Sequence, residues 1–273
     1  MNKGNTNAVK FVFSEKEKEE IIKLHKEGMA LKKIGEKCGS GFKPIIRVLK
    51  KEGEYIIRQS PNYRRGRICN HNFFDIIDTE EKAYWLGFIV ADGHNGEDKK
   101  YISISSHKKD LEHIELFRKT LRSDHSITID KKWQCVVISI YSKQLSQTLS
   151  GYNIHHRKTY DMDGKVLGHI PDAFIHHFIR GYFDGDGCWY VNKKNYNAVE
   201  FGMTGNENFL LPVQKILMTK CNLSLTKMKS KKGTFAKTVI YCGNKQAKKI
   251  AHFLYDGATV FLERKKEKVS HLL

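Results

Sequence analysis

Residues 83–93 read AYWLGFIVADG, and residues 178–187 repeat the pattern as FIRGYFDGDG. When Asp92 is aligned with Asp186, the glycine five residues before each acid and the glycine directly after it also coincide. The apolar residues before each acid predict a helix, so each acid lies at a helix C-terminus. A carboxylate in that position faces the negative end of the helix dipole, which is unfavourable. We therefore interpret the two acids as metal ligands at the ends of two packed helices.

Small residues support close packing of these two helices. Gly87 and Ala91 lie four residues apart, as do Gly181 and Gly185. Residues four apart share one helix face, and small side chains let two backbones approach closely on that face. We expect the glycine after each acid to take the left-handed conformation that ends many helices.

From residue 75 onward the chain reads as two halves with the same order of elements. Each half starts with a motif helix and continues with two strands, a helix, two strands and a helix. Isoleucines alternate with polar residues at 101–105 and 126–130, and Leu223 and Leu225 suggest a strand in the second half. The predicted fold class is α+β, with two pseudo-symmetric αββαββα halves at residues 75–165 and 166–273.

Residues 1–54 predict a small all-α unit that precedes the two halves. Ser14 and Glu17 form a capping box, a glycine-rich turn follows residue 38, and Pro44 falls in the first turn of a basic third helix. This arrangement resembles a helix-turn-helix DNA-binding unit. Residues 55–74 read as a basic linker, either a solvated tether or an arm along phosphates. The predicted DNA contacts in these two segments are Lys43, Arg47, Arg58, Arg64, Arg65 and Arg67.

The chain of 273 residues carries 48 Lys and Arg against 30 Asp and Glu, a formal net charge of +18. A charge of this size favours a polyanion as partner, nucleic acid before an acidic membrane, over a basic surface that serves only solubility. No apolar run approaches the roughly 18 residues that a membrane span needs. Six scattered cysteines without a C-x-x-C pair disfavour a zinc module and predict an intracellular, reducing compartment, such as a bacterial or phage-infected cytoplasm or an organelle.

The two motifs resemble those of the LAGLIDADG homing endonucleases, in their single-chain form with two halves. The resemblance covers roughly residues 75–270. It implies that the motif helices pack at a pseudo-twofold axis and that two four-stranded sheets form a saddle over the major groove of DNA. The family often has a further acid at the sixth motif position, where this chain has Val90 in the first copy and Asp184 in the second.

The resemblance also implies a chemistry. Asp92 and Asp186 would bind two or three Mg²⁺ ions with the backbone carbonyls of Ala91 and Gly185; Mn²⁺ would substitute, and Ca²⁺ would bind without supporting cleavage. A catalytic cation near each scissile phosphate is expected from two lysines at corresponding places in the halves, which are Lys158 and Lys265.

Polar residues on the predicted strands and turns would contact the DNA. In the first half these are Tyr101, Ser103, Ser105, Thr128, Lys132 and Gln134. In the second half they are Asn192, Lys193, Lys194, Asn197, Thr226, Lys227, Lys229 and Lys237.

Three functions remain open at this point. The first is a site-specific, Mg²⁺-dependent endonuclease that makes a staggered double-strand break in a long DNA target. The second is an RNA maturase that assists group I intron splicing, and the third is a regulator that binds DNA without cutting it.

We expect a monomer with double-stranded DNA as partner and no protein partner. Since the chain begins Met1-Asn-Lys, without a splicing nucleophile, we expect a free-standing or intron-encoded protein of a mobile genetic element.

Overall fold

The computed structural model describes residues 12–54, 67–98, 100–156, 158–192, 198–230 and 233–273. The chain forms two compact units, residues 1–66 and residues 67–273.

Three helices make up the N-terminal unit: α1 (Glu15–Lys26), α2 (Leu31–Lys37) and α3 (Phe42–Lys51). The predicted capping box of Ser14 and Glu17 starts α1. Gly35 allows the turn before α3 to pack onto α2, because a Cβ there would lie 2.8 Å from the carbonyl oxygen of Ser40. The helical unit expected at the N-terminus is therefore present. Its core consists of Phe13, Ile21, Leu24, Ile34, Ile45 and Leu49.

The larger unit has the predicted α+β architecture of two αββαββα halves. The first half contains α4 (Glu80–Asp92), β1 (Gly93–Asn95), β2 (Tyr101–His107), α5 (Leu111–Thr120), β3 (Ile127–Asp130), β4 (Cys135–Tyr141) and α6 (Lys143–Gly151). The second contains α8 (Ile175–Asp186), β5 (Gly187–Asn192), β6 (Ala198–Gly205), α9 (Glu207–Cys221), β7 (Lys229–Ser230), β8 (Lys237–Cys242) and α10 (Asn244–Tyr255). Two further short helices are α7 (Lys158–Asp161) and α11 (Glu263–Lys266).

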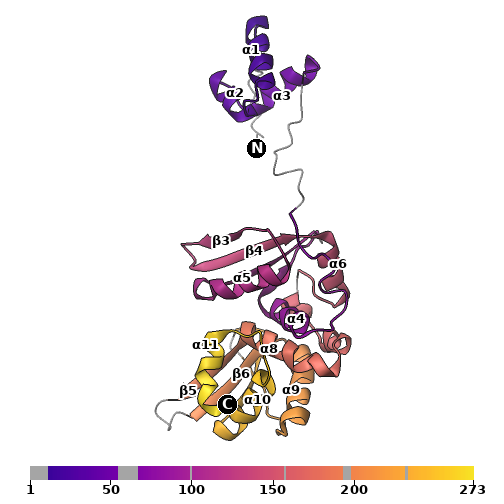
Figure 1. Cartoon of the computed structure of the whole chain (residues 1–273), viewed down its shortest axis with the longest axis vertical. Helices are drawn as coiled ribbons and strands as arrows, with labels where there is room; N and C mark the ends of the chain where they lie inside the picture. The colour runs from indigo at the N-terminus through magenta and orange to yellow at the C-terminus, as the bar shows by residue number, and fades with distance from the viewer. Residues whose placement is uncertain (1–11, 55–66, 99, 157, 193–197, 231–232) are drawn as a thin grey trace, which may run out of the picture. The chain divides into compact units, whose positions relative to one another are not determined.

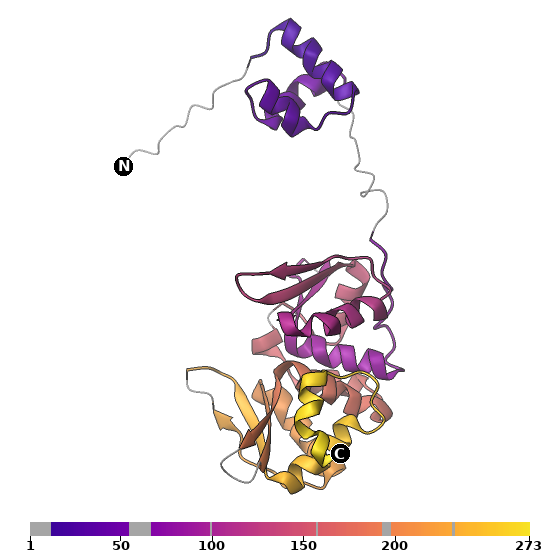
Figure 2. The same cartoon turned by 60° about the vertical axis from the view of Figure 1, so that its left-hand side comes forward.

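Each half forms an antiparallel four-stranded sheet, in the order β1-β2-β4-β3 or β5-β6-β8-β7. Ile102 pairs with Ile140 across β2 and β4, and both side chains are buried on the face that α5 and α6 cover. Ser103 and Ser105 alternate with these isoleucines and lie on the other face of the sheet. Helices α9 and α10 cover the second sheet in the same way (Figure 1). In Figure 2 the β3–β4 hairpin of the first sheet points to the left.

Three sequence expectations need correction. Residues 67–74 are not linker, because Phe73 and Phe74 are buried in the core of the larger unit. The expected strand at 223–225 is absent from this described segment; Leu225 is exposed, and β7 begins only at Lys229.

The third correction concerns the glycine after each acid. Gly93 has φ −80° and Gly187 has φ −102°, so neither is left-handed. The chain passes directly from each motif helix into a strand, and this passage is tight. A Cβ on Gly93 would lie 2.6 Å from the carbonyl oxygen of Ile89, and one on Gly187 would lie 2.1 Å from the ring of Phe183. Glycine is required here by close approach rather than by a left-handed turn.

Among the described residues, no helix has the length and apolarity needed to cross a membrane. All six cysteines lie in described segments and are free thiols.

Candidate active site

Helices α4 and α8 touch through their backbones, side by side in Figure 1. A Cβ on Gly87 would lie 2.0 Å from the carbonyl oxygen of Phe178. A Cβ on Gly181 would lie 1.9 Å from the carbonyl oxygen of Tyr84. Real Cβ atoms do not approach carbonyl oxygens this closely, so both positions need glycine. These two glycines set the distance between the motif helices.

The same close contact continues to the ends of the helices, where the acids lie. A Cβ on Gly185 would lie 2.3 Å from the Cβ of Ala91 and 3.3 Å from the carboxylate of Asp92. Asp92 therefore lies against the end of the opposite helix. Burial and then the negative charge of Asp186 raise the pKa of Asp92 to about 6. Desolvation by the surrounding protein also raises the pKa of Asp186.

Two buried lysines occupy the C-terminal ends of the motif helices. The Lys158 Nζ donates to the carbonyl oxygens of Val90 and Ala91, each at 2.7 Å. The Lys265 Nζ donates to carbonyl oxygens of the α8 terminus, among them those of Phe183 at 2.7 Å, Asp184 at 2.6 Å and Gly185 at 3.3 Å. Burial lowers the pKa of each lysine to about 8. Since cations are favourable at helix C-termini, the lysines offset the unfavourable placement of the acids.

The atoms around the seam form a donor set of oxygens. Two carboxylates lie beside the carbonyl oxygens of Ala91 and Gly185, and hard oxygen ligands suit Mg²⁺ better than zinc or copper. Each carbonyl has a second lone pair besides the one that a lysine uses. Within the described ranges, no three His, Cys, Asp or Glu side chains gather into a group that could hold an ion alone. The oxygen donors at the seam fit a hard divalent cation.

Comparison with known proteins supports this architecture. Residues 173–254 match the family model of a LAGLIDADG-like domain. The crystal structure of the I-LtrWI LAGLIDADG homing endonuclease bound to target DNA superposes with a TM-score of 0.50 at 11% identity, covering 71% of this chain and 89% of that one. The chain has the LAGLIDADG homing endonuclease fold.

Two further solved structures superpose with lower TM-scores. I-CpaMI bound to uncleaved DNA has a TM-score of 0.48 at 14% identity, covering 70% of this chain and 88% of that one. I-SmaMI bound to cleaved DNA has a TM-score of 0.47 at 12% identity, covering 68% of this chain and 86% of that one. A search of the curated proteins by sequence finds no match.

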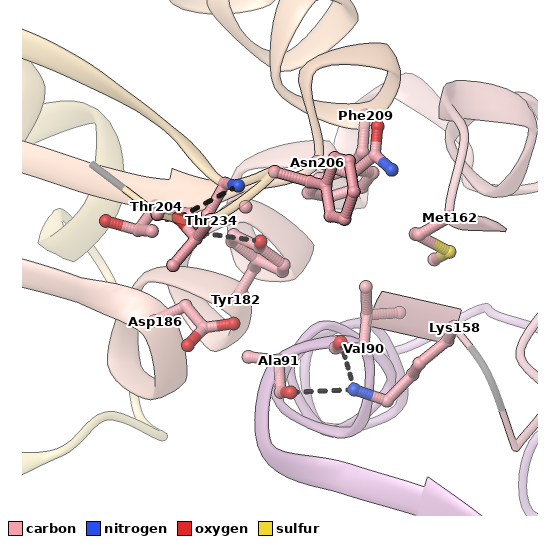
Figure 3. Close-up of a pocket in the computed structure, with 14 residues that line it drawn as sticks. Val90, Ala91, Lys158, Met162, Tyr182, Asp186, Thr204, Asn206, Phe209 and Thr234 are labelled. Atoms are coloured by element: carbon pink, nitrogen blue, oxygen red, sulfur yellow. Dashed lines mark hydrogen bonds between the residues drawn. The ribbon is translucent and has the colours of Figure 1, made fainter. Parts of the chain in front are cut away.

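A cavity of about 470 Å³ opens beside the seam of the LAGLIDADG helices and is lined by residues of both halves (Figure 3). Asp186, Thr204 and Asn206 of the second half line it, and so do Val90 and Lys158 of the first. The Tyr182 hydroxyl donates to the carbonyl oxygen of Thr204 at 2.8 Å and so joins the end of β6 to the motif helix. The cavity gives the acid of α8 a route to solvent.

The predicted DNA contacts lie mainly on exposed surfaces. Lys43 and Arg47 are exposed on α3, and Arg67 is exposed at the start of the larger unit. In the two halves Ser105, Thr128, Lys132, Gln134, Lys227 and Lys229 are exposed, while Tyr101, Ser103 and Lys237 are half-buried. Outside the described residues lie Arg58, Arg64, Arg65, Lys193, Lys194, Asn197 and the side chain of Asn192.

Thr226 is hydrogen-bonded within the fold. It is half-buried, and its hydroxyl accepts from the Gln214 Nε2 at 2.9 Å and donates to the carbonyl oxygen of Ile240 at 3.2 Å. This hydroxyl links α9 to the second sheet.

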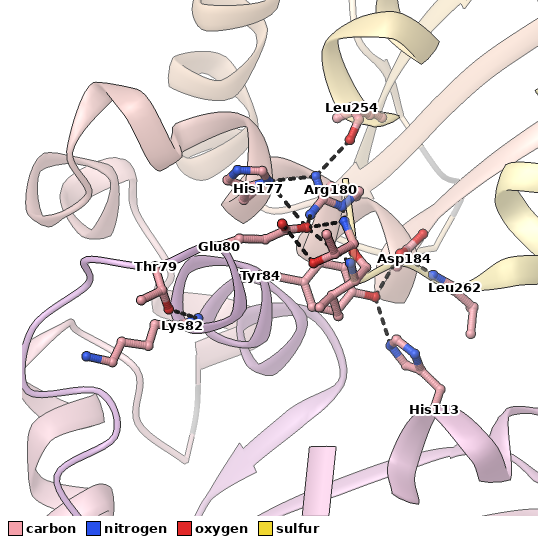
Figure 4. A network of polar contacts seen from close by, with 12 residues as sticks. Thr79, Glu80, Lys82, Tyr84, His113, His177, Arg180, Asp184, Leu254 and Leu262 are labelled. Atoms are coloured by element: carbon pink, nitrogen blue, oxygen red, sulfur yellow. Dashed lines mark hydrogen bonds and ion pairs between the residues drawn. The ribbon is translucent and has the colours of Figure 1, made fainter. Parts of the chain in front are cut away.

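A polar network between the halves was not predicted (Figure 4). Arg180 is fully buried and donates to Glu80 and to the carbonyl oxygens of Leu254 and Val260. The Tyr84 hydroxyl donates to the Asp184 carboxylate at 2.7 Å. In sequence, the only signal was a charged residue on the apolar helix that precedes the second acid.

His113 completes this network and makes the fold sensitive to acid. Tyr84 donates its one proton to Asp184, so His113 Nε2 must donate to the tyrosine oxygen, at 2.8 Å. Burial lowers the pKa of His113 to about 4, from 6.5 in the unfolded chain. Between these two values the unfolded state binds the proton and the folded state does not, so stability falls as the pH falls.

We expect the free energy of unfolding to drop by about 3 kcal/mol from this residue alone between pH 7.5 and pH 4. His113→Gln keeps an N–H donor and should flatten that dependence in urea titrations across the range. His94→Gln, which changes an exposed ring, serves as the control and should leave the slope unchanged. An equal slope in His113→Gln and the parent would contradict the assignment.

Proposed function

We propose that this protein is a site-specific DNA endonuclease that makes a staggered double-strand break by Mg²⁺-dependent hydrolysis. One observation carries the proposal. Glycine contacts bring the ends of α4 and α8 together, so that Asp92 lies against the end of α8, within reach of the charge of Asp186 and beside two buried lysines. Two core helices packed for stability alone would not require an acid at each end.

The chain's residues would divide the chemistry as follows. Bound Mg²⁺ supplies charge neutralisation at the scissile phosphate and a lowered pKa for the attacking water. Asp92 and Asp186, with the Ala91 and Gly185 carbonyls, would hold the metal at the seam. Lys158 and Lys265 keep the helix ends in place and bring a positive charge to each half. One site per half accounts for one cut on each strand.

The uncovered faces of the two sheets would bind the DNA. Among the described residues, helices cover one face of each sheet, and the other face carries Ser103, Ser105 and Thr128 in the first half and Lys229 in the second. The net charge of +18 supplies the attraction to phosphates. I-LtrWI, which has the same fold, was crystallised with its target DNA. In the N-terminal unit, the exposed Lys43 and Arg47 on α3 would add phosphate or base contacts outside the main site.

Cleavage of a defined target tests the proposal. A plasmid carrying the DNA that flanks the gene's own insertion point is incubated with the protein and Mg²⁺, Mn²⁺, Ca²⁺ or excess chelator. We expect linear product with Mg²⁺ and Mn²⁺, and binding without cleavage with Ca²⁺. Tight binding with no cut at any Mg²⁺ concentration would instead indicate a DNA-binding regulator. Splicing activity that survives replacement of both aspartates would indicate an RNA maturase.

Trp133 offers a direct test of the binding face. It is 71% exposed at the β3–β4 turn, whereas Trp85 and Trp189 are 0% and 1% exposed. Asp130 accepts from the backbone amides of Lys132 and Trp133, which fixes this turn. Aromatic rings stack on bases, and lysines are attracted to the phosphate backbone. We therefore expect DNA to protect the Trp133 ring from solvent.

The measurement is acrylamide quenching of tryptophan fluorescence with Ca²⁺ present. Target DNA should lower the quenching constant, since Trp85 and Trp189 are buried and the quenching comes from Trp133. Trp133→Phe removes the exposed reporter and should abolish the change. Unchanged quenching at saturating DNA would mean that the β3–β4 turn does not contact it.

A further inference from the structure

The segment that carries Lys265 is bound to the first half of the molecule. Residues 256–265, here called the strap, run from α10 to α11 in the second half. Glu80, in the first turn of α4, accepts from the backbone amides of Thr259 at 2.8 Å and Val260 at 3.0 Å. Its second carboxylate oxygen accepts from the Thr259 hydroxyl at 2.9 Å. The beginning of the strap is thus fixed to the other half.

A second anchor lies in the middle of the strap. The Leu262 amide donates to the Asp184 carboxylate at 2.8 Å, and the same carboxylate oxygen accepts from the Tyr84 hydroxyl of the first half (Figure 4). This contact gives a reason for the extra acid in the second motif copy. Asp184 binds the strap, whereas Val90 at the same motif position lines the cavity beside Lys158.

The third anchor is adjacent to the lysine itself. Arg264 donates to both carboxylate oxygens of Asp110, from Nε at 2.7 Å and from Nη2 at 2.9 Å. Asp110 is only 3% exposed and precedes α5 of the first half, where the Ser106 hydroxyl donates to it at 3.0 Å. A buried carboxylate needs such a partner, and a two-point contact fixes direction as well as distance. The backbone at residue 264 is therefore oriented by the first half.

Lys158 is held differently. The segment before it is bonded within its own half, where the Asn95 Nδ2 donates to the Ile154 carbonyl oxygen at 2.7 Å. The Tyr152 hydroxyl donates to the Phe74 carbonyl oxygen at 2.8 Å. Both lysines thus donate to the carbonyl oxygens at the end of a motif helix. The segment before Lys158 is held by its own half, whereas the segment before Lys265 is held by the opposite half.

We propose that Asp110 is a positioning residue for Lys265, so that the first half of the molecule orients the lysine of the second half through Arg264. Asp110 acts through the strap and does not contact the substrate. The positioning follows from the contacts of the strap; its consequence for cleavage rests on the proposed nuclease function. The expected consequence is unequal cutting of the two DNA strands, because loss of the Asp110–Arg264 contact disturbs one of the two sites.

Lysine labelling tests the position independently of activity. The full chain is treated briefly with formaldehyde and cyanoborohydride, and methylation at Lys265 and Lys158 is followed by mass spectrometry. In Asp110→Asn and in Arg264→Gln, we expect labelling of Lys265 to rise at least about 5-fold through local opening of the strap, with Lys158 unchanged. Asp78→Asn removes an exposed ion pair of the first half and should leave the labelling rates of both lysines as low as in the parent.

Two labelling outcomes would overturn the proposal. Unchanged labelling of Lys265 in folded Asp110→Asn would show that the contact does not hold the lysine. An equal rise at Lys158 and Lys265 in both variants would show general loosening of the fold, with no local positioning.

Strand-specific cleavage gives the second readout. With a supercoiled target plasmid, Asp110→Asn should slow cutting of one strand by about 10-fold, so that nicked circles accumulate. Equal slowing of both strands would contradict the asymmetry. If the parent protein cuts neither strand, the nuclease proposal fails, and the labelling result still decides the role of Asp110.

Discussion

Replacement of Asp92 by asparagine is expected to abolish double-strand cleavage while DNA binding persists. The amide keeps the shape of the side chain but loses the negative charge that would hold Mg²⁺. Loss of several kcal/mol of transition-state stabilisation corresponds to at least about a 1000-fold slower cut. Asp186→Asn should slow cleavage to the same extent, because both carboxylates lie at one seam. Single-turnover cleavage and gel-shift binding with Ca²⁺ measure the two effects separately.

The matched control is Glu112→Gln, which removes one exposed negative charge from α5, on the covered side of the first sheet. It should cut at the parent rate. The double variant of both aspartates should be hardly slower than either single one, since the two groups act as a unit. Cleavage by Asp92→Asn within about 10-fold of the parent would remove the basis of the metal assignment.

Gly181→Ala is expected to destabilise the larger unit more than other single-methyl additions. The new Cβ would lie 1.9 Å from the Tyr84 carbonyl oxygen. Backbone cannot move aside as a flexible side chain does, so the motif helices must separate. We expect a loss of at least about 3 kcal/mol and a fall in melting temperature of roughly 10 °C.

Gly151→Ala is the control for this change. Gly151 also lies in a helix, at the end of α6, but a Cβ there would meet nothing within 4 Å. That variant should be as stable as the parent or gain about 0.5–1 kcal/mol, because alanine restricts the unfolded chain. Calorimetry of the two variants side by side is the measurement. If Gly181→Ala melts with the parent, the motif helices are not in backbone contact.

Much of the fold could be predicted because its signals are local. The two motif helices, the alternating strands and the small residues at 87 and 181 follow from periodicity within short stretches. The repeat of the pattern predicted two like halves, and the aligned acids predicted where the helices end. The prediction of a left-handed conformation for Gly93 was wrong, because the chain passes directly from the helix into a strand. The position of that strand depends on its pairing in the sheet.

The candidate site was only partly readable in sequence. Their corresponding places in the two halves singled out Lys158 and Lys265, but the contacts of these lysines with helix-terminal carbonyls depend on segments 67 to 82 residues away in the chain. The Asp110–Arg264 contact joins residues 154 positions apart. No local pattern encodes such pairs, because each partner is an ordinary charged residue in its own segment.

The sequence by itself determined the repeated helices, their terminal acids and the glycines that allow contact, since side-chain size and spacing act over one or two helical turns. Only the tertiary structure decided which lysines support those acids and that the first half anchors the strap that carries Lys265. The physical reason is that a buried charge needs a partner at hydrogen-bonding distance, and packing of the whole chain selects that partner.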